Sequence, residues 1–163
     1  MPLQRKVISP ANALSRLQEL CARSEQCSYD LLQKLRKWGI GASDSEKIMT
    51  QLRKERFCDD SRYAEAFVTD KLLYNHWGRR KIALAMRAKR IPSDIAAEAL
   101  EAIDEEEYLK ILHALTKAKA SRLGPLTDFE ERSKLFRFLA ARGFESALIS
   151  QAIKETMALQ SQS

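Results

Sequence analysis

The segment 79–90, RRKIALAMRAKR, holds six basic residues and no acidic one. An arginine guanidinium can bind a carboxylate or a phosphate through two parallel hydrogen bonds, so this segment suits an acidic protein surface or a nucleic acid backbone. Helical spacing places Ile82, Met86 and Lys89 on one stripe, which leaves room for arginines off the buried face. The basic residues of this helix are candidate partner contacts: Arg79, Arg80, Lys81, Arg87, Lys89 and Arg90.

The charge around this helix is unevenly distributed. Residues 91–108 hold seven acidic residues and no basic one, although the whole chain carries a net charge of +6. Lys34 and Lys37 can extend the basic surface from an earlier helix. Such a dipolar surface can steer one face toward DNA phosphate or an acidic protein groove. The competing interpretation is an ordinary solvated helix face. Arg79 and Arg80 gain little from the dipole at a helix start, however, and this favours a functional reason for them.

Two adjacent carboxylates, Asp59 and Asp60, raise the question of a metal or catalytic site. Adjacent carboxylates can hold Mg²⁺, but no third acidic ligand follows at a supporting spacing. Helix capping explains the pair better, with Asp59 as the N-cap and Asp60 in the first turn, because carboxylates favour the positive end of a helix. The pattern predicts a structural motif and no metal.

Cysteine and histidine give no sign of catalysis or metal binding. Cys21 and Cys27 are six residues apart, which is not zinc-knuckle spacing, and with Cys58 they are predicted to be reduced, packed thiols. His76 has no nearby nucleophile or carboxylate to orient it. Trp38 and Trp77 could stack on nucleic acid bases, but packing between repeats is the favoured interpretation. The sequence predicts no catalytic residue and no cofactor.

Helices must position these side chains. The chain of 163 residues has only five glycines and four prolines, and its composition favours an all-α protein. Gly39 ends a helix over 28–38 in the C′ position, and Ser43 or Asp44 is expected to cap the next helix. Gly78 separates two helices and Gly143 ends another. The predicted helices cover 11–24, 28–38, 59–75, 79–90, 93–103, 105–121, 128–142 and 146–158, and the helix after Ser43 or Asp44 carries Ile48, Met49 and Leu52.

An internal repeat relates these helices. Leu31, Leu35 and Ile40 match Ile82, Met86 and Ile91 at a shift of 51 residues, and match Leu135, Leu139 and Phe144 at a shift of 104. The interpretation is three tandem three-helix repeats over 11–57, 58–104 and 105–158, after a flexible arm at 1–10 and before a disordered tail at 159–163. Stacked in a row, they would form an elongated, curved body, expected to be a monomer.

Several motifs resemble those of the RecX family. Residues 57–64, FCDDSRYA, resemble the signature that opens its second repeat, which makes Asp59, Asp60 and Arg62 structural motif residues. Residues 78–82, 31–40 and 129–144 resemble its other repeat motifs, around Gly78, Gly39 and Gly143. Together these motifs span about 11–157 in the right order. Arg79 stands where the family has proline, and Arg90 where it has glycine, which implies a different helix stop there.

The resemblance implies a non-enzymatic regulator that binds the RecA nucleoprotein filament along its groove. It implies restraint of ATP hydrolysis, strand exchange or filament growth, in DNA recombination and the SOS response. Two alternatives stay open: a module that binds single- or double-stranded DNA directly, and a helical-repeat scaffold for another protein. With no apolar run of about 18 residues and no signal-peptide core, the chain is expected in the cytoplasm and not in a membrane.

Overall fold

The computed structural model describes residues 7–162, and this part of the chain is entirely helical with no strand. Residues 1–6 of the predicted arm lie outside the described residues. Its remainder meets the first helix directly, because the Ser9 side chain caps a helix that begins at Pro10. The helices are α1 (Pro10–Arg23), α2 (Ser28–Lys37), α3 (Ala42–Lys54), α4 (Asp60–Leu73), α5 (Arg79–Ala88), α6 (Ser93–Glu101), α7 (Glu105–Leu123), α8 (Phe129–Ala141) and α9 (Ser146–Ser161).

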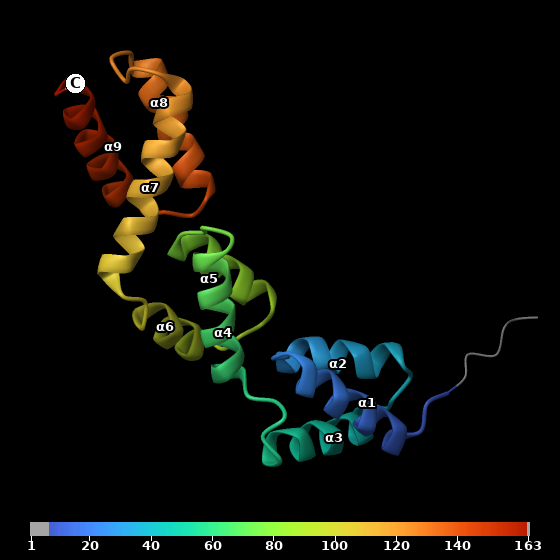
Figure 1. Ribbon diagram of the computed structural model, residues 1–163. Coiled ribbons are helices and arrows are strands. Elements are labelled where there is room, and N and C mark those ends of the chain that lie inside the picture. Colours follow the sequence, from blue (N-terminus) through green and yellow to red (C-terminus); the bar gives the residue numbers. More distant parts are fainter. Residues whose placement is uncertain (1–6, 163) are drawn as a thin grey trace, which may run out of the picture.

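The helices form three groups of three, in agreement with the predicted repeats. The main helix–helix contacts lie within α1–α3, within α4–α6 and within α7–α9. Figure 1 shows the groups following one another in an elongated, curved row, with α7 running from the middle group into the third. In residues 7–162, no helix is both long enough and apolar enough to cross a membrane.

The repeat register predicted from the sequence is confirmed residue by residue. All nine matched apolar side chains are buried. At the third position of each set, the backbone N–H donates to the carbonyl of the second position: Ile40 to Leu35 (3.0 Å), Ile91 to Met86 (3.1 Å) and Phe144 to Leu139 (3.3 Å). This hydrogen bond closes a helix in the Schellman motif. The middle helix of each group therefore ends in the same way.

The residue before each of these N–H groups has a positive φ, which is 78° at Gly39, 55° at Arg90 and 96° at Gly143. The prediction that Arg90 imposes a different helix stop is wrong. Arg90 adopts the left-handed conformation that glycine usually takes, although a side chain makes it costly. The middle repeat thus keeps the shared geometry against the local preference of the residue.

Two local predictions need correction. Neither Ser43 nor Asp44 caps α3, since that helix begins at Ala42 after Gly41 and has no side-chain cap. Of the segment 159–163 predicted as a disordered tail, residues 159–161 belong to α9, and residue 163 lies outside the described residues. The order of residues 159–161 has a tertiary cause, because the Gln160 side chain accepts a hydrogen bond from the Leu126 backbone N–H (3.0 Å).

The apolar core has two parts. One cluster belongs to α1–α3 and the turn after it, including Leu17, Leu35, Leu52 and Cys58. A larger cluster runs without interruption through α4–α6 and α7–α9, and it also takes in Cys27 from the first group. The middle and third groups therefore form one packed unit, while the first group has a core of its own.

Candidate functional site

The candidate residues gather where successive groups meet. The first junction denotes the contacts between the helices α1–α3 and α4–α6, and the second junction those between α4–α6 and α7–α9. Both involve the start of the middle helix of the earlier group and the first turns of the group that follows. These two places decide which basic side chains are held inside the molecule and which remain available.

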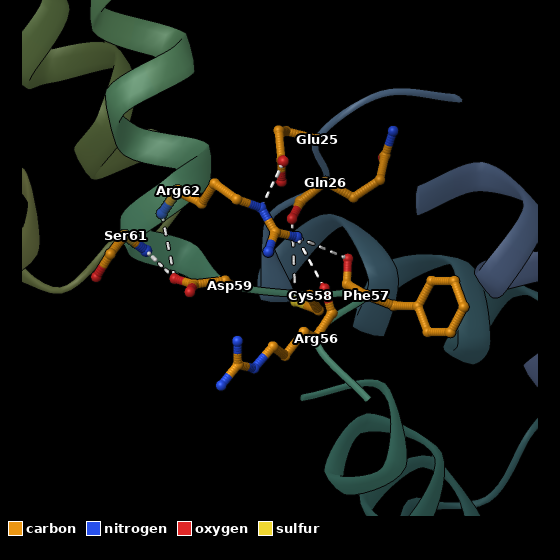
Figure 2. Close-up of polar contacts among 8 residues, drawn as sticks. All are labelled: Glu25, Gln26, Arg56, Phe57, Cys58, Asp59, Ser61 and Arg62. Carbon is orange, nitrogen blue, oxygen red and sulfur yellow. Dashed lines mark hydrogen bonds and ion pairs between the residues drawn. The ribbon is translucent and has the colours of Figure 1, made fainter. Parts of the chain in front are cut away.

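Arg62 joins the two sides of the first junction (Figure 2). Its Nε lies 2.5 Å from Glu25 Oε1, and Nη2 donates to the backbone carbonyls of Arg56 (3.0 Å) and Phe57 (3.4 Å). The hydrogen bond to Glu25 raises the pKa of Arg62 above its ordinary value. Both side chains keep about a third or more of their surface exposed, at 41% for Arg62 and 31% for Glu25. The pair orients the groups but contributes little stability.

The two adjacent aspartates act on backbone N–H groups. The Asp59 carboxylate accepts from the N–H groups of Ser61 (2.9 Å) and Arg62 (3.1 Å), which confirms the predicted N-cap (Figure 2). Asp60 accepts from the N–H of Ser28 (2.9 Å), the first residue of α2. No group of three or more ligating side chains that could hold a metal ion occurs in residues 7–162. The pair therefore caps two helices, one of them in the preceding group.

Two basic residues of the candidate set also belong to the first junction. Lys89 Nζ lies 2.9 Å from Asp30 Oδ2, and this hydrogen bond raises the pKa of Lys89. The Arg90 guanidinium lies over the Tyr29 ring at 5.1 Å from its centroid. These contacts join the end of α5 to the start of α2, which is the helix that carries Lys34 and Lys37.

The second junction brings two glycines into direct backbone contact. The Gly78 N–H donates to the carbonyl of Arg142 (2.8 Å), and the Arg80 N–H donates to that of Gly143 (2.9 Å). A Cβ on Gly78 would lie 2.4 Å from the Gly143 carbonyl carbon, and a Cβ on Gly143 would lie 2.4 Å from Lys81 Cβ. Only glycine fits such an approach. The family motifs around these two positions thus meet in space.

Arg79 is held inside the second junction. Its guanidinium binds Glu145 (2.8 Å) and Glu105, and lies over the Tyr108 ring at 3.9 Å from the centroid. Partial burial lowers the pKa of Arg79, but the hydrogen bonds to both glutamates raise it by more. The Tyr108 hydroxyl accepts from the Arg79 backbone N–H (3.0 Å) and donates to Glu145. Burial, together with this bond to Glu145, raises the pKa of Tyr108.

The remaining candidate residues differ in the exposure of their side chains and in whether these have partners within the chain. The side chains of Arg80, Arg87 and Lys37 are exposed and make no hydrogen bond or ion pair within residues 7–162, and Lys34 is half-buried. Lys81 Nζ lies 4.5 Å from the centroid of Trp77, a half-buried ring packed on the larger core. Trp38 packs on the core of the first group. The predicted basic helix therefore has tied and free members.

The acidic segment borders a hollow on the packed unit of the middle and third groups. This hollow, of about 370 Å³, lies between α4, α6 and the start of α7. Carboxylates of Glu65, Asp104 and Glu107 line it together with apolar side chains, and no basic residue does. The charge separation read from the sequence thus has a spatial counterpart at Asp104 and Glu107.

The three cysteines are free thiols, as predicted. Burial is the main cause that raises the pKa of Cys21 and of Cys27 to about 11. Cys58 lies 3.5 Å from the Ser28 hydroxyl at the first junction, and burial raises its pKa as well. Thiols held in the neutral form are poor nucleophiles, so their role here is packing.

Sequence reasoning missed the partners across the junctions, which are Glu25, Tyr29, Asp30, Glu105, Tyr108 and Glu145. One signal in the sequence could have identified Tyr108, which is its spacing from a capping aspartate. Tyr63 and Tyr108 each follow a capping aspartate by four residues, Asp59 and Asp104. The acidic partners of Arg79 lie 26 and 66 residues away, where no local pattern could connect them.

Comparisons with known proteins agree with this geometry. A family model described as "RecX, second three-helix domain" matches residues 59–100, and one described as "RecX, third three-helix domain" matches residues 105–153. Among curated relatives, "Regulatory protein RecX" of Chromohalobacter salexigens is 31% identical over 134 residues, covering 82% of this chain and 86% of that protein. The protein of the same name from Clostridium botulinum Alaska E43 is 28% identical, covering 93% and 74%.

Solved structures show the same fold. A crystal structure of regulatory protein RecX superimposes with a TM-score of 0.79 at 23% identity, covering 90% of this chain and 71% of that one. The crystal structure of RecX from Lactobacillus salivarius gives a TM-score of 0.79 at 21% identity, covering 90% and 97%. The likeness extends over the row of three-helix groups rather than over one of them.

Proposed function

The chain belongs to the RecX family of regulatory proteins, and from this premise we propose that it binds the RecA nucleoprotein filament and restrains it. It acts as a non-enzymatic regulator in the cytoplasm, and it inhibits ATP hydrolysis, strand exchange and filament growth during recombination and the response to DNA damage. The curved row of three groups supports contact along a filament groove, because a row presents one extended surface.

The proposed contact surface rests on one observation, which is that some basic side chains of α5 are exposed and unpaired. Arg80 and Arg87 are exposed and have no hydrogen-bond or ion-pair partner for their side chains within residues 7–162. Their neighbours Arg79 and Lys89 are bound to carboxylates of the chain itself. The free guanidinium groups are available to bind the carboxylates of a partner, and this supports the proposed contact. We place the RecA contact at Arg80 and Arg87, with Lys34 and Lys37 extending it.

A titration of RecA's DNA-dependent ATPase with the purified protein tests this function. Inhibition is expected at less than equimolar ratio, and no effect at equimolar ratio would refute the proposal. The double variant Arg80→Glu/Arg87→Glu should lose inhibition while it keeps its helical circular dichroism. Lys47→Glu/Lys117→Glu is the matched control, since both lysines are exposed elsewhere and the charge change is the same. Equal loss of inhibition in the control variant would show that the effect depends on overall charge and not on Arg80 and Arg87.

Direct DNA binding is the second candidate function, because free arginines also suit phosphate. In that case, affinity for single- or double-stranded DNA in the absence of RecA should fall steeply with salt. The double variant should then lower the slope of this dependence by about two. A protein that shows neither activity would instead be a scaffold for another partner.

A further inference from the structure

The exposed face of α5 combines charge with one large apolar side chain. Leu84 is 67% exposed and packs on neither core cluster. It follows Arg80 by four residues and precedes Arg87 by three, so the three side chains share one face of the helix. Ile82 and Met86 lie on the opposite, buried face. An arginine–leucine–arginine stripe therefore points away from the protein.

The composition of this stripe distinguishes between possible partners. A phosphate backbone binds a guanidinium through charge and hydrogen bonds. It has no apolar surface on which a leucine side chain could be buried. A protein groove with an apolar floor gains by burying the leucine, while carboxylates at its edges bind the arginines. Helices dock in this way with anchors at positions such as i, i+4 and i+7. Arg80, Leu84 and Arg87 have this spacing.

The equivalent helix of the first group carries only part of this combination, because at the repeat shift of 51 residues Tyr29 stands in the place of Arg80 and Gln33 in that of Leu84. Arg36 occupies on α2 the position of Arg87 on α5, at the repeat shift of 51 residues. A hollow of about 470 Å³ between α2 and α3 is lined by Arg36, Arg53 and the 39% exposed Leu32. The full arginine–leucine–arginine stripe is therefore a feature of the middle group, and in the first group Leu32 lies one position away from the place of Leu84.

We propose that the stripe Arg80–Leu84–Arg87 docks as a helix into an apolar groove of a partner protein whose edges carry carboxylates, with Leu84 as the apolar anchor. This inference rests on the proposed function, and it assigns the free arginines of α5 to a protein surface of RecA rather than to the DNA that RecA binds. Arginine is among the residues that carry most of the binding energy of an interface, and burial of an apolar side chain such as that of leucine adds to it.

Substitutions of Leu84 test the anchor in the RecA ATPase assay. Leu84→Ser should raise the concentration for half-inhibition about tenfold, because burial of a leucine side chain is lost. Leu84→Met should stay within about twofold, since methionine has a similar apolar volume. Leu159→Ser is the matched control, as Leu159 is 60% exposed on α9 and lies away from α5. Circular dichroism should be unchanged in all three variants.

Each outcome decides between the proposals. If the wild type inhibits RecA and Leu84→Ser inhibits equally well, the apolar anchor is refuted while the regulatory function stands. If Leu84→Ser and Leu159→Ser weaken inhibition to the same degree, the effect is not specific to α5 and the anchor is also refuted. A wild type without any effect on RecA removes the proposed function and this inference with it.

Discussion

At both junctions, a residue in the first turns of one helix binds a backbone N–H at the start of a helix in the preceding group. Asp60 does so for Ser28 at the first junction, and Tyr108 does so for Arg79 at the second. The repeat therefore supplies the same contact twice. The chemistry differs, since an aspartate carboxylate serves one junction and a buried tyrosine hydroxyl the other.

The two junctions also differ in how closely the backbones approach. Gly78 and Gly143 let two backbone hydrogen bonds cross the second junction, while none crosses the first within residues 7–162. At the first junction, Cys27 stands in the place of Gly78, at a shift of 51 residues, and Arg90 in that of Gly143, at a shift of 53. Side chains at these positions keep the backbones apart. The first group is thus tied by side chains, and the other two share a core.

This difference predicts where the molecule opens first. Partly exposed ion pairs contribute little stability, whereas a continuous core unfolds as one unit. The first group is expected to move or unfold separately from the packed pair that follows. Substitutions at equivalent places of the two junctions should therefore have unequal effects.

Gly143→Ala should have the largest effect. Its Cβ would lie 2.4 Å from Lys81 Cβ, and the residue must keep a φ of 96°. We expect a loss of about 3 kcal/mol or more in the free energy of unfolding, measured by urea denaturation. Gly39→Ala, with positive φ but open space, should cost about 1 kcal/mol. Gly41→Ala has neither constraint and should change the free energy of unfolding little. Equal effects at all three glycines would contradict the close backbone approach at the second junction.

Tyr108→Phe should follow in size. The change removes the hydroxyl that binds both Glu145 and the Arg79 backbone, so buried polar groups lose their partner. The expected cost is about 2 kcal/mol of unfolding free energy. Tyr74→Phe is the control, because Tyr74 is 78% exposed and should cost nothing measurable.

The same tyrosine makes stability depend on alkaline pH. Its pKa is raised in the folded protein, so the contribution is complete below the ordinary pKa of 10.0 and declines as the pH rises above it. Each pH unit above that value should cost about 1.4 kcal/mol, measured by denaturation between pH 9 and 11. Burial raises the pKa of Tyr63 to about 12 and the pKa of Cys21 and Cys27 to about 11, so these groups add to the decline. Tyr108→Phe should make the decline above pH 10 less steep by about 1.4 kcal/mol per pH unit, and an unchanged slope would argue against this assignment.

Arg62→Met should act on the first junction alone. It removes the exposed ion pair with Glu25 and the hydrogen bonds to the carbonyls of Arg56 and Phe57, at a cost of about 1 kcal/mol in global stability. Amide hydrogen exchange in α1–α3 should become faster while that in α7–α9 stays the same. Uniform acceleration through the chain would show that the two junctions are coupled.

Arg90→Gly should have the smallest effect, and of opposite sign. Glycine relieves the positive φ of 55°, but the contact of the guanidinium with Tyr29 is lost. A net gain of about 0.5 kcal/mol in the free energy of unfolding is expected, measured by thermal unfolding. A clear loss would mean that the arginine contact holds the first junction more strongly than its geometry indicates.

Local signals in the sequence determined much of the fold. Apolar spacing located the helices, and the shifts of 51 and 104 residues predicted the repeat and its nine buried positions. Asp59 was recognised as a cap because the capping hydrogen bonds reach only two and three residues ahead. Such features depend on neighbours along the chain, so a single sequence contains them.

The tertiary structure alone decided which arginines are free. Nothing near Arg79 in the sequence distinguishes it from Arg80, yet one binds Glu105 and Glu145 while the other keeps an exposed side chain. The order of residues 159–161 and the contact of Gly78 with Gly143 have the same origin. They arise where distant backbones approach, and that approach depends on the packing of whole helices rather than on any local preference.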